Sequence, residues 1–143
     1  MKIVIVLNEK KSHWFSCQII LNNLIECYRL LGGYDNFKII YLKSNYGILD
    51  YYKPSKEIAD LKPQFLIFLD HRPNFAPIIQ LLSKMLPTSS FPKIFFHIYG
   101  DFMWFTKYWE EMEEHLEGKQ VSFLCASERQ QKIIRKFLPK KMI

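Results

Sequence analysis

The sequence lacks the features that mark a membrane-spanning chain or a disulfide-stabilised one. No apolar run approaches the roughly 20 residues that cross a bilayer. The short apolar run after Lys2 has no small-residue cleavage site of the signal-peptide type. The three cysteines, Cys17, Cys27 and Cys125, are odd in number and form no C-x-x-C pair, which argues against a disulfide framework and a zinc site. We therefore expect a cytoplasmic chain that binds no metal.

The sequence also lacks the motifs by which many enzymes hold phosphate or activate a nucleophile. Neither G-x-G-x-x-G nor G-x-x-x-x-G-K-[ST] is present, and the first predicted strand is followed by a turn without glycine. A G-x-S-x-G nucleophile elbow is absent as well. These absences argue against a dinucleotide at that turn, and we expect no cofactor.

The composition is that of a compact folded domain. Of the 143 residues, 49% are hydrophobic and 16% aromatic, which is enough to bury a sizeable core in one domain spanning residues 1–143. The net charge of +6 favours anionic partners, namely phosphates, nucleic acid or an acidic membrane surface.

Five short apolar segments without polar alternation are typical of strands covered on both faces. They are residues 3–7, 37–42, 65–69, 94–98 and 121–126. Segments of helical periodicity follow them at about 15–31, 55–61, 75–85, 102–117 and 128–138. The alternation predicts an α/β fold, a Rossmann-like three-layer sandwich whose parallel sheet has about five strands in the order 3-2-1-4-5.

Three helices carry further predictions. The buried face of the first is expected to carry Cys17, Leu21, Leu24, Tyr28 and Leu31. Ser55 is expected to cap the second, and the S-x-x-Q run from Ser127 to Gln130 predicts a capping box for the last.

The predicted strand order places the first candidate site beside the fourth strand. In such sheets ligands bind outside the carboxyl ends of the strands, here beside His97, Tyr99, Gly100 and Asp101. His97 can serve as a general base or bind a sugar or phosphate, because its unperturbed pKa lies near neutrality. A core histidine bonded to a backbone carbonyl is the alternative. Asp101 can accept a hydroxyl proton or cap the next helix.

Cationic side chains lie in the loops at the same predicted edge. Lys10, Lys11 and His13 follow the first strand and Arg72 follows the third, and all four can neutralise a phosphate. Solvated surface loops are the alternative. A basic cluster near the end of the chain can touch acidic lipid or a neighbouring domain, or simply provide solubility. Its members are Lys132, Arg135, Lys136, Lys140 and Lys141.

Three segments together resemble the amino-terminal domain of GT-B glycosyltransferases, especially the family-four group of retaining enzymes. L-K-P-Q-F-L-I-F (61–68) is similar to the family's lead-in to strand three. F-H-I-Y-G-D-F (96–102) is similar to the end of strand four, and V-S-F-L-C-A-S-E-R-Q (121–130) to the closing strand, serine and helix. The resemblance implies a Rossmann-like domain that binds the acceptor and faces a carboxyl-terminal domain holding a nucleotide-sugar.

On that resemblance His97 and Asp101 are the catalytic candidates on the acceptor side, with Ser127 near the floor of the cleft. The implied partners are a glycan or lipid-linked acceptor and the donor domain, with peripheral contact at the inner face of the membrane and no nucleic acid. The sequence departs from the family in two ways. The usual glycine pair after strand one is replaced by residues 8–14, and the chain stops at Ile143, before any second domain and the E-x-x-x-x-x-x-E donor motif of that domain. We therefore expect no sugar transfer by this polypeptide alone.

Two other interpretations remain open. A receiver-like signalling domain would use Asp70 as its phosphate acceptor. It would also need an acidic pair after the first strand and a lysine after the fifth, where this sequence has Asn8-Glu9 and Ser127. The other is a non-catalytic Rossmann-like partner subunit.

Overall fold

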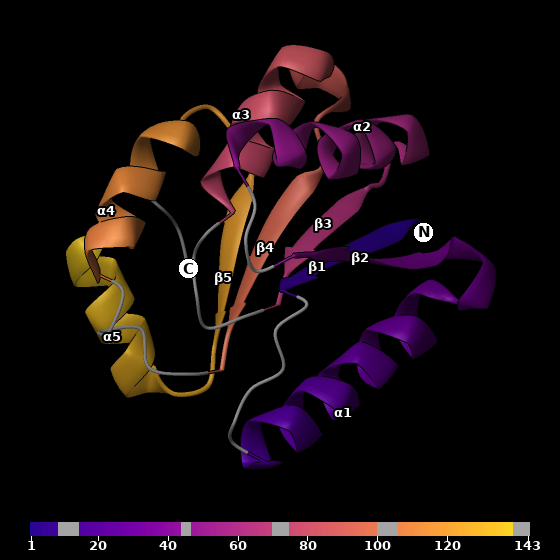
Figure 1. The fold of residues 1–143 in the computed structure, drawn as a ribbon. Helices are drawn as coiled ribbons and strands as arrows, with labels where there is room; N and C mark the ends of the chain where they lie inside the picture. The colour runs from indigo at the N-terminus through magenta and orange to yellow at the C-terminus, as the bar shows by residue number, and fades with distance from the viewer. Residues whose placement is uncertain (9–14, 44–46, 70–74, 100–105, 139–143) are drawn as a thin grey trace.

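The described part of the chain is built around one parallel sheet. The computed structural model describes residues 1–8, 15–43, 47–69, 75–99 and 106–138 (Figure 1). The strands are β1 (Ile3–Asn8), β2 (Phe37–Leu42), β3 (Phe65–Phe68), β4 (Lys93–Ile98) and β5 (Val121–Cys125). Every pairing between them is parallel. The predicted α/β fold with a five-stranded parallel sheet is confirmed.

A helix follows each strand, as the periodicity predicts. The helices are α1 (Phe15–Gly32), α2 (Tyr52–Leu61), α3 (Ala76–Met85), α4 (Thr106–His115) and α5 (Glu128–Phe137). Short 3₁₀ turns cover Tyr34–Asn36, Ile48–Tyr51 and Thr88–Ser90. Among the described residues, none of these helices is both long and apolar enough to cross a membrane.

The start of α2 differs from the prediction. The helix begins at Tyr52, directly after a 3₁₀ turn, so Ser55 lies inside it and is not its cap. Pro54 is tolerated because a proline in the first turn gives up an N–H that has no partner within the helix.

The predicted strand order is wrong. The sheet runs β2-β1-β3-β4-β5, so β3 lies between β1 and β4. Leu66, Ile67 and Phe68 of β3 are all buried, whereas Lys38 and Tyr41 of β2 are exposed. A wholly apolar strand belongs in the middle of a sheet, and a strand with a lysine suits its edge. The chain therefore reverses its direction across the sheet between β1 and β3, not between β1 and β4.

The helices cover the two faces unequally. The step from β1 to β2 crosses the sheet in one direction and the later steps cross it in the other. Right-handed connections then place α1 on one face and α2, α3 and α4 on the opposite face. Ile134 and Leu138 bring α5 into the same core as α2 to α4. Figure 1 accordingly shows α1 separated from the other four helices.

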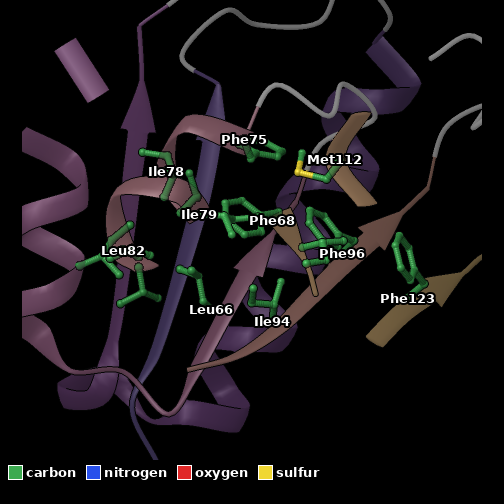
Figure 2. Packing of buried hydrophobic residues seen from close by; sticks show 14 of the residues in the cluster. Leu66, Phe68, Phe75, Ile78, Ile79, Leu82, Ile94, Phe96, Met112 and Phe123 are labelled. Atoms are coloured by element: carbon green, nitrogen blue, oxygen red, sulfur yellow. The ribbon is translucent and has the colours of Figure 1, made fainter. Parts of the chain in front are cut away.

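The larger core is centred on a row of aromatic rings under α3 and α4 (Figure 2). Phe96 of β4 stacks on Phe68 of β3 at 5.1 Å and on Phe123 of β5 at 5.3 Å, measured between ring centroids. Phe75 stacks on Phe68 at 4.6 Å, and Trp109 of α4 meets Phe96 edge-on at 5.1 Å. These rings fix β3, β4 and β5 relative to α3 and α4.

The smaller core lies beneath α1. Leu21, Leu24, Ile25 and Tyr28 of this helix pack on apolar side chains of β1 and β3. The helix approaches the sheet closely at its last residue, because a Cβ on Gly32 would lie 3.1 Å from Cδ1 of Ile3. One helix cannot span five strands. On this face Phe95 and His97 of β4 are therefore half-buried, and Leu124 of β5 is 37% exposed.

Candidate functional site

His97 lies at the carboxyl end of β4, where the sequence places it. It pairs in register with Leu124 of β5, and its side chain projects toward α1 because Phe96 and Ile98 point into the opposite core. Nδ1 of His97 is 2.7 Å from the phenol oxygen of Tyr28. The two rings meet edge-on, at an interplanar angle of 89° and a centroid separation of 5.9 Å. The histidine is therefore bonded to a side chain of α1, whereas the alternative interpretation assigned it a backbone carbonyl.

Burial keeps both members of this pair neutral. It lowers the pKa of His97 below its usual 6.5, because an imidazolium ion would lose hydration under α1. It also raises the pKa of Tyr28 to about 12, with a smaller contribution from the negative charge that Cys27 gains when it ionises. At neutral pH a neutral imidazole therefore faces a neutral phenol, and the bond between them is uncharged.

The second ring nitrogen of His97 is the chemically available one. Within the described part of the chain, Nε2 has no hydrogen-bond partner. A phenol can donate to Nδ1, which leaves the proton on Nε2, or accept from Nδ1–H, which leaves a lone pair on Nε2. The Tyr28 contact thus orients the ring while Nε2 stays free to donate to a hydroxyl or accept from one.

Other described residues border the same edge of the sheet. Asn8 ends β1, Leu69 follows β3 and Tyr99 follows β4. Asn8 and Tyr99 are half-buried, and Tyr99 packs against the core beneath α1. Since β3 separates β1 from β4, the carboxyl ends of β1 and β4 are not neighbours at this edge.

Most of the other predicted site residues cannot be positioned. Lys10, Lys11, His13, Arg72, Gly100 and Asp101 lie outside the described residues, as does Asp70 of the receiver-like alternative. Among the residues that are described, no group of three His, Cys, Asp or Glu side chains is arranged to hold a metal ion.

Ser127 has a structural role in the described fold. Its hydroxyl accepts a hydrogen bond from the Gln130 amide at 3.2 Å, and it forms the N-cap of α5. The backbone N–H of Ala126 donates a hydrogen bond to Oε1 of Gln130 at 2.8 Å, one residue before the donor that the capping box predicts. The predicted cap is confirmed, while contact between Ser127 and an acceptor stays a prediction.

A cavity of about 730 Å³ opens at the opposite, amino edge of the sheet. Lys62, Lys93 and Lys119 line it together with serine and threonine hydroxyls. The lining also includes the carboxylate of Glu117, so the cavity carries charges of both signs. None of the site residues predicted from the sequence lines it.

Tyr28 is the site residue that sequence reasoning did not connect to the others. It was correctly predicted on the buried face of α1, but not as a partner of His97. The signal was available, because a buried tyrosine hydroxyl normally finds a hydrogen-bond partner and the neighbouring side chains of that face are aliphatic. A histidine in an otherwise apolar strand was the obvious complement.

Comparison of the chain with family models, with curated proteins and with solved structures finds no match. The class of protein is therefore defined by the fold: an α/β domain with a Rossmann-like, all-parallel sheet.

Proposed function

We propose that this chain is the acceptor-binding domain of a GT-B glycosyltransferase and that it binds a saccharide at the carboxyl edge of its sheet, beside His97. The observation that carries the proposal is a neutral imidazole that Tyr28 orients through Nδ1 and whose Nε2 bonds to no described residue. Sugars present hydroxyls, which both donate and accept hydrogen bonds, and a neutral imidazole complements them in either tautomer.

The local structure of the three family-like segments supports the same proposal. Residues 61–68 run from the end of α2 into β3, and residues 121–130 form β5, the Ser127 cap and the start of α5. The described part of 96–102 is the end of β4, with His97 on the side facing α1. The described parts of the three segments thus have the secondary structure that the resemblance implies.

In the proposed reaction His97 and Asp101 act on the acceptor hydroxyl, and a second, carboxyl-terminal domain supplies the nucleotide-sugar. His97 is suited to the role of base only when Nδ1–H donates to Tyr28, since Nε2 then carries a lone pair. Its lowered pKa keeps that lone pair available at neutral pH. In this proposal transfer requires both domains, and the domain described here contributes the binding of the acceptor.

The solvent face of α5 supports peripheral contact with acidic lipid as part of this proposal. Lys132, Arg135 and Lys136 are all exposed on this helix. A cluster of this kind gains about 1 kcal/mol per cation near an anionic bilayer. A lipid-linked acceptor would then be held at the surface where it occurs.

The test is a saccharide titration followed by NMR. We expect a panel of glucose, mannose, N-acetylglucosamine and their disaccharides to include a ligand that shifts the signals of His97 and Tyr99. His97→Ala should weaken that binding at least tenfold, and His97→Gln, whose amide nitrogen replaces Nε2, should recover part of it. His115→Ala is the matched control, because His115 lies on α4 and bonds Gln80 far from this edge. Shifts confined to the lysine-lined cavity, or no binding by any saccharide, would refute the proposal.

The strand order favours a second candidate, the receiver-like domain. The order β2-β1-β3-β4-β5 is the flavodoxin-like order of doubly wound sheets, which receiver domains share. A receiver domain needs an acidic pair after the first strand and a lysine after the fifth. In this chain Asn8 ends β1 and Ser127 follows β5, so the residues fit that class poorly. Incubation with acetyl phosphate separates the two candidates: stable phosphorylation that is lost in Asp70→Asn would establish the receiver function.

A further inference from the structure

The outward surface of α1 is apolar and exposed. Its outer stripe consists of Ile19, Ile20, Asn23, Cys27, Leu30 and Leu31, all of them exposed. At 100° per residue these positions fall within about a third of the helix circumference. Leu30 and Leu31 are 68% and 67% exposed, and Ile19 and Ile20 are 45% and 43% exposed. Leu31 was predicted to be buried with Tyr28, and the structure corrects that prediction.

The outer stripe carries no charged side chain. The two charges of α1, Glu26 and Arg29, lie beside it and form an ion pair with each other at 2.6 Å. A helix that is apolar on two sides is normally buried on two sides. By contrast, α5 presents Lys132, Arg135 and Lys136 to solvent. The surface of α1 is therefore that of a helix with a missing partner.

We propose that the outer stripe is the contact of a homodimer, in which α1 packs antiparallel against α1 of a second copy. The apolar pairs Ile19–Ile20 and Leu30–Leu31 lie at equal distances from a midpoint near residue 25. An antiparallel two-fold pairing sets the isoleucines of each copy against the leucines of the other. Asn23 then faces Cys27, and these smaller side chains let the two helices approach. Such self-complementarity is the requirement of a two-fold interface.

The chemistry of α1 favours a second copy over a lipid surface. Helices that lie on membranes border their apolar side with lysine and arginine. The only cation of α1 is Arg29, which is already paired with Glu26. The outer stripe thus matches an apolar protein surface and lacks the attraction to anionic headgroups.

The exposed apolar area of the outer stripe determines how tightly we expect the dimer to associate. Together with Tyr34, which is 72% exposed just beyond the helix, the outer stripe offers a few hundred Å² of apolar surface. Burial of roughly 1,000 Å² in a symmetric pair is near the lower limit for specific interfaces. The dimer should therefore exchange with monomer and depend on concentration.

Sedimentation equilibrium of the full chain tests the proposal. We expect the mass to rise from 17.2 kDa toward twice that value as concentration increases. Ile20→Glu and Leu30→Lys should each raise the dissociation constant at least tenfold, because each places two charges against apolar side chains of the other copy. Leu49→Lys is the control: this leucine is 88% exposed but lies outside the outer stripe, so association should be unchanged.

Mixing the two charged variants tests the antiparallel geometry itself. In the mixed dimer Glu of one copy faces Lys of the other, and the remaining Ile–Leu contact is intact, so the mixture should associate where each variant alone does not. Circular dichroism of each variant confirms that the helix is retained. A wild-type chain that stays at 17.2 kDa over the whole concentration range would overturn the proposal, as would a mixture no tighter than its components.

Discussion

The contact between Tyr28 and His97 joins the one helix on its face of the sheet to the strand that carries the candidate site. Tyr28 also packs among the aliphatic side chains beneath α1. This packing holds its ring in place, and the hydroxyl of that ring orients the imidazole of His97. The proposed saccharide binding and the stability of the fold therefore involve the same hydrogen bond. Substitutions at either residue should report on both.

Replacing Tyr28 by phenylalanine should lower the free energy of unfolding by about 1 kcal/mol, the typical contribution of one neutral hydrogen bond. The ring and its packing remain, so the loss isolates the 2.7 Å contact to His97. Urea unfolding at pH 7.5 measures it. Tyr34→Phe is the control, since that hydroxyl belongs to an exposed side chain and should leave stability unchanged. Equal losses in the two variants would mean that the contact contributes nothing.

Acidification should destabilise the fold through His97. Burial lowers the pKa of His97 in the folded state below 6.5, so the unfolded chain binds more protons between the two values. Stability is then fully present above pH 6.5 and declines as the pH falls from 6.5 through the folded pKa. Urea unfolding at pH 7.5 and pH 5 should show this decline, and His97→Gln should reduce it. A decline of the same size in the variant would assign the effect to other groups.

At the scale of elements, a buried hydroxyl in α2 is a local defect. Ser55 is fully buried, and its Oγ has no hydrogen-bond partner among the residues that the structure describes. Ser55→Ala removes an unsatisfied polar group and introduces the best helix former, so it should stabilise the fold by about 1 kcal/mol.

Ser127 provides the matched comparison for Ser55, because its hydroxyl is engaged as the cap of α5. Ser127→Ala should destabilise by about 1 kcal/mol, while Ser127→Asp should be nearly neutral. Thermal or urea unfolding of the two alanine variants should thus give changes of opposite sign. A loss of stability in Ser55→Ala would show that its hydroxyl is satisfied after all.

The elements themselves could be predicted because hydrophobic period is a local property. Apolar runs gave the strands, and Ser127 with Gln130 gave the start of α5. The strand order depends on which strands touch, and continuity of the chain alone does not decide that. Lys38 in β2 against the unbroken apolar run of β3 was the available sign that β2 is an edge strand. That contrast indicates that β2 lies at the edge of the sheet and that β3 lies in its interior, next to β1.

The candidate site was predictable only in part for the same reason. His97 stood out because a polar residue in an apolar strand is informative wherever it lies. Its partner Tyr28 is 69 positions away in sequence, and only the crossing of α1 over the sheet brings the two together. A contact of this kind depends on how α1 packs on the sheet, and neither composition nor hydrophobic periodicity predicts that packing.

At the scale of the whole molecule, the two faces of the sheet contribute differently. The face under α2 to α5 contains the stacked rings of Phe68, Phe96 and Phe123, and four helices exclude water from it. The face under α1 is covered by one helix and leaves β4 and β5 partly exposed. The larger core thus lies on one side of the sheet, and the proposed saccharide contact and the proposed dimer contact lie on the other.

Two neighbouring phenylalanines of β4 test this division. Phe96 is buried among the aromatic rings, whereas Phe95 faces the α1 side and is half-buried. Phe96→Ala should cost about 3–5 kcal/mol, a large share of the roughly 5–15 kcal/mol that stabilises a domain. Phe95→Ala should cost less than half as much, because part of that ring already contacts water. Urea unfolding of both variants measures the ratio. Similar losses would show that the α1 face is packed as completely as the other, and the open surface beside His97 that the saccharide proposal requires would then be missing.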